Sequence, residues 1–272
     1  AQVTVFTDHL TESDAVVARL QPFDVVCVMR ERTPMTREII ERLPRLRLIA
    51  STGARNASID AHAAEERGIQ IVHTNYTATP TIEMTWALIL ASARNLVDEN
   101  ASLRRGGWQR HIGTDLDGST LALLGLGNIG SAVARIGKAF GMNVVAWSQN
   151  LTAERAEAEG ATLVSKEELF RQADFLSIHT VLSKRTRGLV GAADLALMKP
   201  TARLVNTSRG PIVVEADLIA ALRDGTIAGA AVDVFDQEPL PADHPFRTLP
   251  NLLATPHIGY VSRGLYRHFY GD

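Results

Sequence analysis

Three polar residues of types that perform acid–base and anion-binding chemistry follow short apolar runs in the C-terminal half of the chain. They are Arg209 in VNTSRGPIV, Glu238 in VDVFDQEPL and His257 in ATPHIGY. A histidine both donates and accepts protons near neutral pH, and a neighbouring carboxylate stabilises its protonated form. An arginine binds a carboxylate through paired hydrogen bonds. These residue types together predict proton transfer on a substrate that carries a carboxylate.

Each of the three residues also has a simpler explanation when it is taken singly. Arg209 can form a structural ion pair, Glu238 can be a loop carboxylate before Pro239, and His257 can be a hydrogen-bonded buried imidazole. All three, however, stand at the ends of predicted strands. Because the carboxyl ends of strands in a doubly wound sheet line one ligand crevice, we expect the three side chains to converge there.

A glycine-rich turn precedes these residues in the sequence TLALLGLGNIG. Gly125 permits a tight turn, Gly127 lets a pyrophosphate approach the backbone, and Gly130 lets a helix pack on the strand. The helix that follows, predicted over 128–140, presents free N–H groups and its positive dipole end to a phosphate. A purely structural turn is the alternative, but the strand–turn–helix context predicts dinucleotide binding.

The second strand after this turn, NVVAW, lacks the acidic residue that usually follows it. Ser148 and Gln149 stand where an Asp or Glu would bind the adenine ribose and repel a 2′-phosphate. Lys184 and Arg185 follow the strand DFLSIH and are the cations placed to reach the adenine side. We therefore expect NAD(H) as the slightly favoured cofactor, with NADP(H) accepted within about tenfold.

Alternating strands and helices surround these motifs and predict an α/β fold with two lobes, each a parallel sheet. In the first 75 residues, predicted strands begin at Val3, Asp24, Leu46 and Ile69. A second series begins at Ser119, with strands in TLALLG, NVVAWS, ATLV, DFLSIH, ARLVNTS, GAAVDVF and NLLATPH. Helices are predicted between these strands at Asn128–Phe140, Thr152–Glu159, Lys166–Gln172, Ala192–Leu197 and Glu215–Arg223.

One long apolar helix, from Thr81 to about Arg104, is predicted to join the two lobes. It carries more apolar surface than one contact face needs, which predicts a subunit interface and a homodimer. A helix that only crosses between domains is the alternative. The apolar residues concerned are Trp86, Leu88, Ile89, Leu90 and Leu96.

The composition bounds the class of protein. A chain of 272 residues predicts about two domains, and a net charge of −2 without a dense basic run argues against nucleic-acid and membrane partners. The single cysteine, Cys27, and an N-terminus unlike a signal peptide predict a cytoplasmic protein. The scattered histidines predict no metal site. The abrupt end VSRGLYRHFYGD leads us to expect a piece of a longer protein.

The motifs STGARN, GLGNIG, LVNTSRGPIV, AVDVFDQEPL and TPHIG together resemble the D-isomer-specific 2-hydroxyacid dehydrogenase family over nearly all of the chain. The resemblance implies a flavodoxin-like substrate domain at 1–76 and a Rossmann nucleotide-binding domain at 77–258, joined by long helices. It also implies that residues 259–272 begin a segment that returns to the substrate domain.

The resemblance also implies roles for individual residues. His257 is the acid/base, Glu238 tunes it, and Arg209 binds the carboxylate or carbonyl of the substrate. The substrate carboxylate is also held by backbone N–H groups of Thr52, Gly53 and Ala54. The implied cofactor-binding residues are Gly125, Gly127, Asn128, Ile129, Gly130, Ser148, Gln149, His179, Thr180, Thr186, Thr207, Ser208, Asp233 and Gly259.

The predicted function is therefore hydride transfer between a nicotinamide dinucleotide and a small 2-hydroxy acid or 2-keto acid. A dinucleotide-sensing regulatory protein is the alternative, although a sensor has no need of a proton donor. Formate oxidation is disfavoured, because loss of hydride from formate requires no acid–base pair. Glyoxylate, hydroxypyruvate, glycerate, phosphoglycerate and longer keto acids all stay open as substrates, since their recognition falls to loops at residues 30–32 and at Arg55.

Overall fold

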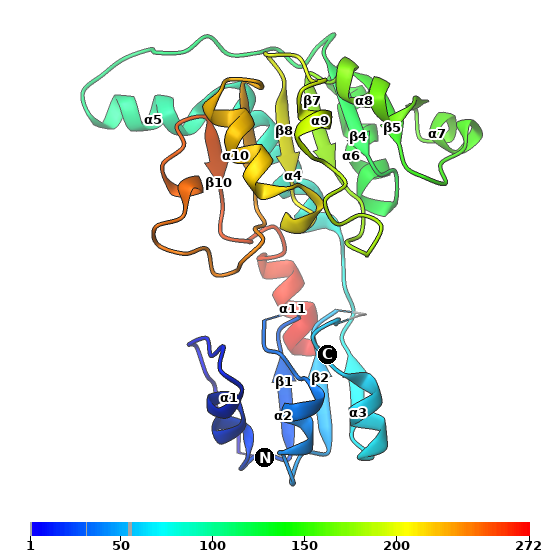
Figure 1. Ribbon diagram of the computed structural model, residues 1–272, viewed down its shortest axis with the longest axis vertical. Coiled ribbons are helices and arrows are strands. Elements are labelled where there is room, and N and C mark those ends of the chain that lie inside the picture. The colour runs from blue at the N-terminus through cyan, green and yellow to red at the C-terminus, as the bar shows by residue number, and fades with distance from the viewer. Residues whose placement is uncertain (1, 31, 54–55) are drawn as a thin grey trace. The chain divides into compact units, whose positions relative to one another are not determined.

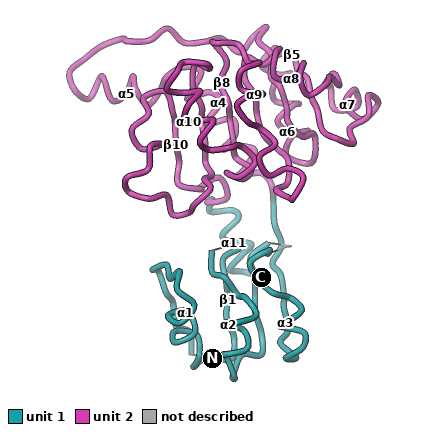
Figure 2. Tube along the Cα trace, in the orientation of Figure 1, with its two compact units in different colours: residues 1–77, 262–272 teal, residues 78–261 magenta. Residues whose placement is uncertain are grey.

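The computed structural model describes residues 2–30, 32–53 and 56–272 (Figure 1). The chain divides into two compact units (Figure 2). Unit 1 comprises residues 1–77 together with 262–272, and unit 2 comprises residues 78–261. The returning C-terminal segment gives unit 1 a helix that is distant in sequence from the rest of it.

Unit 1 contains a parallel sheet of three strands in the order β1-β2-β3. Its fully buried centre is formed by Met35, Ile39, Ile40, Leu43 and Ile49, so an apolar core is built around the middle strand. The strands are β1 (Val25–Val28), β2 (Leu48–Ser51) and β3 (Gln70–His73), and the helices are α1 (Ser13–Leu20), α2 (Arg37–Glu41), α3 (Ala61–Glu66) and α11 (Arg263–Gly271).

The strand predicted at Val3 is not found, so that prediction is wrong. Residues 3–6 form no strand, and the side chains of Val3 and Val5 are 81% and 78% exposed. β-Branched residues favour an extended backbone only where a neighbouring strand supplies hydrogen bonds and packing. Local sequence therefore suggested a strand that the tertiary structure of this unit does not pair.

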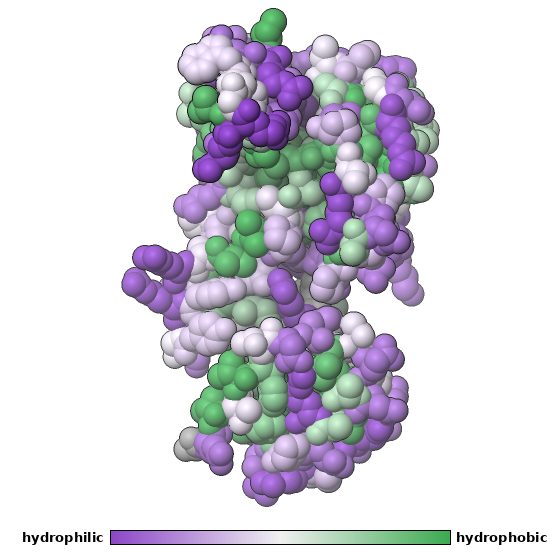
Figure 3. All heavy atoms as spheres, turned by 90° about the vertical axis from the view of Figure 1, so that its left-hand side faces the viewer, coloured by the Kyte–Doolittle hydropathy of each residue, from purple (hydrophilic) through white to green (hydrophobic). Residues whose placement is uncertain are grey.

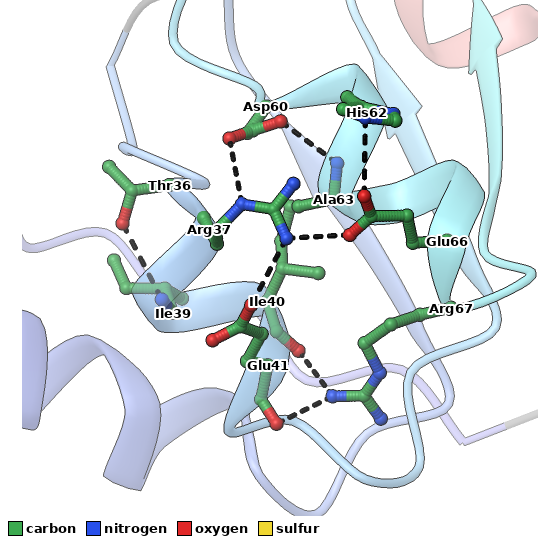
Figure 4. Close-up of polar contacts among 10 residues, drawn as sticks. All are labelled: Thr36, Arg37, Ile39, Ile40, Glu41, Asp60, His62, Ala63, Glu66 and Arg67. Carbon is green, nitrogen blue, oxygen red and sulfur yellow. Dashed lines mark hydrogen bonds and ion pairs between the residues drawn. The ribbon is translucent and has the colours of Figure 1, made fainter.

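Two arginines connect α2 with α3 in unit 1 (Figure 4). Arg67 donates hydrogen bonds to the carbonyl oxygens of Ile40 (2.7 Å) and Glu41 (2.6 Å), which lie in the last turn of α2. Arg37 lies 2.6 Å from Glu66 and 3.2 Å from Glu41. The two short helices are therefore fixed to each other by charged hydrogen bonds as well as by their apolar faces.

Unit 2 contains a parallel sheet of seven strands in the order β10-β9-β8-β7-β4-β5-β6. The chain proceeds from β4 to one side of the sheet and then from β7 to the other, so the order reverses between β4 and β7, which is where ligands bind in such sheets. The strands are β4 (Thr120–Leu124), β5 (Asn143–Trp147), β6 (Thr162–Leu163), β7 (Phe175–Ile178), β8 (Arg203–Asn206), β9 (Gly229–Val232) and β10 (Leu252–Ala254).

Helices cover both faces of this sheet, and each face has its own apolar core (Figure 1). Phe170, Leu124 and Leu204 are buried on one side, and Trp86, Leu121 and Val133 on the other. All seven strands predicted in this part of the chain are present, and the α/β fold class is confirmed. The helices are α4 (Thr79–Ala93), α5 (Leu96–Arg104), α6 (Asn128–Ala139), α7 (Ala153–Ala158), α8 (Lys166–Gln172), α9 (Ala192–Leu195) and α10 (Glu215–Arg223).

The single helix predicted from Thr81 to Arg104 is wrong, because the structure has two helices there. They are separated at Asn95, whose φ of 49° lies in the left-handed region. Asparagine adopts this conformation at a lower cost than most residues, and a left-handed residue ends an α-helix. The helical pattern in the sequence did not reveal this interruption.

The apolar side chains named for that predicted helix do not form one exposed surface. Trp86, Leu88 and Ile89 are buried inside unit 2, whereas Leu96 on α5 is 53% exposed. Figure 3 views this side, where hydrophobic residues lie among hydrophilic ones at the surface. The other large exposed apolar residues of this region are Val97, Leu103, Trp108 and Ile112.

None of the helices in the described part of the chain has the length and hydropathy that a crossing of the lipid bilayer requires.

Candidate functional site

The sequence-predicted residues of unit 2 follow the carboxyl ends of its parallel strands. Gly125 follows β4, His179 follows β7, Arg209 lies beyond β8, Glu238 lies beyond β9, and His257 lies beyond β10. In a parallel sheet these ends lie along one edge. The topology therefore collects residues from distant parts of the sequence at one edge of unit 2.

The glycine turn after β4 has close backbone contacts that exclude larger residues at two positions. Gly125 has a φ of 107°, and a Cβ on it would lie 2.8 Å from the carbonyl carbon of His179. A Cβ on Gly130 would lie 2.2 Å from the carbonyl oxygen of Gly125. A Cβ on Gly127 would meet no atom of the described residues within 4 Å. The turn is therefore tightly packed on the protein side and open at Gly127.

This open turn leads directly into α6, whose first residues are Asn128, Ile129 and Gly130. No side chain of the described residues caps α6, so its first N–H groups remain available to a ligand. The hydroxyl of Thr180, in the segment after β7, is buried and lacks a hydrogen-bond partner within the described chain. The open glycine, the free helix N-terminus and the unpaired hydroxyl fit a dinucleotide phosphate.

Several other residues predicted to bind the cofactor contact the protein itself. The Ser208 hydroxyl donates to the carbonyl oxygen of Thr180 (2.5 Å), and the Thr207 hydroxyl pairs with that of Thr85 (2.8 Å). The Thr186 hydroxyl accepts from the backbone N–H of Ser183 (2.7 Å) and closes the turn after β7. These side chains shape the segments next to the glycine turn.

His179 is neutral at this edge of the sheet. Its Nε2 atom lies 2.8 Å from the Ser177 hydroxyl, and burial lowers the pKa of His179 to about 4. The imidazole therefore carries no charge near neutral pH, and it contributes packing against Gly125 rather than electrostatic attraction for a phosphate.

The end of β5 presents no charged side chain. Ser148 is half-buried and Gln149 is exposed. Lys184 and Arg185 are exposed in the segment after β7, and β7 is separated from β5 only by β4. With a strand spacing of about 4.8 Å, the ends of β5 and β7 are roughly 10 Å apart, a distance that long basic side chains can span.

Two of the three residues first considered, Glu238 and His257, are in direct contact, and the charge of Arg209 acts on Glu238. Nδ1 of His257 lies 2.5 Å from Oε2 of Glu238, and Oε1 of Glu238 accepts a hydrogen bond from the backbone N–H of Phe235 (3.0 Å). The Arg209 guanidinium donates to the Ser208 carbonyl oxygen (2.6 Å). Because Nδ1 of His257 faces the carboxylate, Nε2 is the ring nitrogen that remains for exchange of a proton with a substrate.

The Glu238 carboxyl remains ionised in this arrangement. Burial by itself raises its pKa, but the hydrogen bond and charge of His257, the Phe235 N–H and the charge of Arg209 outweigh that effect and lower the pKa of Glu238. A carboxylate beside the imidazole is the condition under which a protonated histidine is stabilised.

Asp233 holds the turn that carries His257, a role that sequence reasoning missed. Its carboxylate is almost fully buried and accepts from the backbone N–H groups of Ile258 (2.9 Å) and Gly259 (2.7 Å) and from the Thr255 hydroxyl (2.5 Å). These bonds fix His257 at a φ of 53°. The position of Asp233 directly after a buried strand was the available signal, but its partners follow a different strand.

The aromatic ring of Tyr260 contacts the imidazole ring of His257. The two rings are 5.8 Å apart at 86°, an edge-to-face arrangement. This contact restricts rotation of the His257 ring about its Cβ–Cγ bond.

The predicted substrate loop lies in unit 1. The backbone N–H of Thr52 donates to the carbonyl oxygen of Val28 (3.1 Å), and that of Gly53 donates to the Thr74 hydroxyl (3.0 Å). Gly53 has a φ of 76°. Ala54 and Arg55 lie outside the described residues. The role of this loop in binding a substrate carboxylate stays a prediction.

Nowhere in residues 2–30, 32–53 and 56–272 do three or more His, Cys, Asp or Glu side chains form a group able to hold a metal ion.

A family model decides the classification of the chain. The model for the D-isomer specific 2-hydroxyacid dehydrogenase NAD-binding domain matches residues 86–259, which include the glycine turn, Arg209, Glu238 and His257. The chain belongs to this family.

Two similar curated relatives carry different names. A glyoxylate reductase from Aeropyrum pernix is 43% identical over 236 residues, which cover 83% of this chain and 70% of the relative. A D-3-phosphoglycerate dehydrogenase from Methanocaldococcus jannaschii is 40% identical over 250 residues, which cover 90% of this chain but only 47% of the relative. The chain thus spans about half the length of that second relative.

Solved 2-hydroxyacid dehydrogenase structures have the same fold. A phosphoglycerate oxidoreductase from Vibrio cholerae O395 matches with a TM-score of 0.93 at 37% identity, covering 98% of this chain and 87% of that one. A D-lactate dehydrogenase from Aquifex aeolicus, crystallised with NAD and lactic acid, matches with a TM-score of 0.79 at 26% identity, covering 94% of this chain and 82% of that one. Family and neighbour agree on NAD as the dinucleotide.

Proposed function

We propose that this protein catalyses reversible hydride transfer between NAD(H) and a small 2-hydroxy acid or 2-keto acid. The observation that carries the proposal is the contact of 2.5 Å between Nδ1 of His257 and Oε2 of Glu238, formed within the same unit as the glycine turn. A binding protein that only senses a dinucleotide has no use for this proton-transfer pair.

The chain's own residues perform the acid–base part of the reaction. A bound nicotinamide supplies or receives the hydride. In reduction, Nε2 of His257 gives a proton to the keto oxygen, and in oxidation it removes the hydroxyl proton. Glu238 stabilises the imidazolium, and Arg209 binds the carboxylate and polarises the carbonyl. The glycine turn and the N-terminus of α6 hold the phosphates.

We propose a short 2-keto acid as the substrate in the reductive direction. Glyoxylate reductases and D-3-phosphoglycerate dehydrogenases are among the relatives at about 40% identity, and both names denote compounds with a carboxylate next to the reacting carbon. We assign that carboxylate to Arg209, whose guanidinium can bind it through paired hydrogen bonds.

We further propose that NADP(H) is accepted alongside NAD(H), and that the protein is a cytoplasmic homodimer. The neutral end of β5 supports the relaxed cofactor preference, because it neither repels nor attracts a 2′-phosphate. The exposed apolar side chains of α5 and the segment after it, which include Leu96, Leu103 and Trp108, support the dimer.

A screen of 2-keto acids by loss of NADH absorbance tests the proposed function. His257→Ala should lower turnover on the best substrate by roughly 10²–10⁴, the usual contribution of acid–base catalysis. NADH affinity, measured by fluorescence titration, should stay close to that of the unmodified protein. His9→Ala, which changes an exposed histidine of unit 1, is the control. Turnover by His257→Ala at the level of this control would disprove the assignment.

A further inference from the structure

A second histidine–carboxylate pair lies in unit 2, apart from Glu238 and His257. Nε2 of His244 lies 2.9 Å from Oε1 of Glu215, and Nδ1 of His244 accepts a hydrogen bond from the backbone N–H of Phe246 (3.2 Å). Both side chains are largely buried. Because Nδ1 accepts, the proton of the neutral ring is on Nε2 and points to the carboxylate. Both ring nitrogens are therefore engaged within the protein.

This second pair connects the segments that carry the reacting residues. Glu215 is the first residue of α10 and follows the 3₁₀ turn Gly210–Ile212 that comes directly after Arg209. His244 lies in the segment that follows Glu238. The hydrogen bond between Glu215 and His244 thus fixes the Glu238 segment to the segment after Arg209.

The backbone at Phe235 and Asp236 provides a second connection. The N–H of Phe235 donates to Oε1 of Glu238 (3.0 Å), and the N–H of Asp236 points to Oε2 of Glu215 at the longer distance of 3.5 Å. Two successive amides are therefore directed to the two carboxylates. The Glu215 carboxylate therefore contacts the backbone directly beside the residue whose N–H holds Glu238.

The backbone of Phe235 and Asp236 also packs closely against the turn that follows Arg209. A Cβ on Gly210 would lie 2.1 Å from the carbonyl carbon of Phe235 and 2.6 Å from the nitrogen of Asp236, so only glycine permits this approach. A cavity of about 10 Å³ lies among Asn206, Gly210, Glu215 and Asp236, which is room for one water molecule. The turn after Arg209 and the Glu238 carboxylate therefore both contact the backbone of Phe235 and Asp236.

Charged side chains from several elements surround Asp236. Burial and the Glu215 carboxylate raise the pKa of Asp236, while Arg187 and His244 act in the opposite direction. Asp236 is therefore within electrostatic range of Glu215, Arg187 and His244. The region behind the reacting residues is therefore polar and ordered by specific contacts.

We infer that Glu215 and His244 form a positioning pair, which sets the Glu238 carboxylate beneath His257 and Arg209 beside it without touching the substrate. The inference rests on the proposed function, because it assigns reacting roles to Arg209, Glu238 and His257. Its physical basis is that a displacement of about 1 Å at a reacting group costs on the order of 10²-fold in rate.

Variants at Glu215 test this inference against a matched control in the same turn of α10. Asp217 lies two residues further along and accepts from the backbone N–H of Ala192 (2.8 Å), which belongs to α9 rather than to the reacting segments. Glu215→Ala removes the bond to His244 and the longer contact with the Asp236 N–H, and Asp217→Ala removes the bond to Ala192. Urea unfolding is expected to show similar losses of stability in the two variants.

Kinetic measurements distinguish a role of Glu215 in positioning the reacting residues from a role in protein stability alone. Glu215→Ala should lower kcat by about tenfold or more, leave the KM for NADH within about twofold, and shift the pH profile of reduction. Asp217→Ala should leave kcat and the profile within about twofold. Glu215→Gln keeps one acceptor for Nε2–H of His244 and should recover most of the rate. It also serves as the milder variant if Glu215→Ala does not fold.

The outcomes distinguish this inference from the proposed function. Equal kcat values and pH profiles for Glu215→Ala and Asp217→Ala overturn the positioning role while leaving the proposed function intact. Normal turnover of His257→Ala and Glu238→Gln defeats the proposed function itself. NMR chemical shifts of the His257 ring nitrogens add a readout besides activity. Their pH dependence should differ from that of the unmodified protein in Glu215→Ala and should stay the same in Asp217→Ala. The same pH dependence in both variants overturns the inference.

Discussion

The Glu238 carboxylate bridges His257 and the backbone of Phe235, with one oxygen 2.5 Å from Nδ1 of His257 and the other 3.0 Å from the Phe235 N–H. The backbone bond fixes the direction of the carboxylate, so the imidazole is held in the orientation that presents Nε2. The lowered pKa of Glu238 keeps the carboxyl charged over the range in which a histidine titrates.

Glu238→Gln should move the pH profile of reduction to lower pH. Reduction requires the protonated imidazole, and the loss of the neighbouring charge makes that form less stable. The alkaline limb of kcat/KM should therefore move to lower pH, and kcat should decrease. Steady-state rates of keto acid reduction across pH measure the effect. An unchanged alkaline limb would show that Glu238 does not act on the proton donor.

Kinetics with both cofactors should show a preference for NAD(H) of no more than about tenfold, or roughly 1.4 kcal/mol. Ser148 and Gln149 are neutral and discriminate weakly, whereas Gln149→Asp should raise the preference for NAD(H) by repelling the 2′-phosphate. A thousandfold preference in the unmodified protein contradicts this expectation. If that preference is for NADP(H), neutralising Lys184 and Arg185 together should abolish it.

His179 should make unit 2 less stable in mild acid. The folded protein binds a proton at His179 only near pH 4, while the unfolded chain does so near 6.5. The unfolded state therefore holds more protons between these values, and the stability contribution falls as pH decreases from 6.5 to 4, by up to about 3 kcal/mol.

His179→Gln removes this titration. Denaturant unfolding between pH 7 and pH 4 should show a flatter loss of stability in the variant, compared as a slope because the bond to Ser177 is also lost. His9→Gln changes an exposed histidine and should keep the original slope. Parallel slopes for all three proteins would count against a neutral buried His179.

Arg67→Met should destabilise unit 1 by roughly 1–2 kcal/mol, because it removes charged hydrogen bonds to the carbonyl oxygens of Ile40 and Glu41 at the end of α2 (Figure 4). Arg42→Met is the matched control, since the ion pairs of Arg42 with Glu38 and Asp14 are exposed. Its effect should stay within about 1 kcal/mol. Urea unfolding followed by circular dichroism measures both, and equal effects would contradict the capping role of Arg67.

Light scattering at micromolar concentration should give the mass of a dimer. Leu96→Glu combined with Leu103→Glu places charges on one face of α5 and should shift the mass toward a monomer. Asp98→Lys changes a charge on the opposite, exposed face of the same helix without removing apolar surface and should leave the dimer intact. A monomeric mass for the unmodified protein would exclude the homodimer.

Local sequence determined those elements whose signals are complete within one segment. The helix over Lys166–Gln172 was predicted with the bounds that α8 has, and in the structure a capping box of Ser165 and Glu168 begins it. The strands of unit 2 were predictable because a parallel strand buried on both faces is a continuous apolar run. The glycine spacing after β4 likewise predicted a turn, and in the structure Gly125 of this turn has a positive φ.

Tertiary structure decided what depends on partners distant in sequence. Residues 3–6 have the composition of a strand but no neighbouring strand pairs with them, and the left-handed Asn95 divides a stretch whose pattern is helical throughout. Asp233 and Gly259 are 26 residues apart, and Glu215 and His244 are 29 apart. A hydrogen bond between such residues forms only when the sheet has brought the ends of separate strands to one edge. The sequence alone therefore supplied His257 and Glu238, and the fold supplied the contacts that hold them.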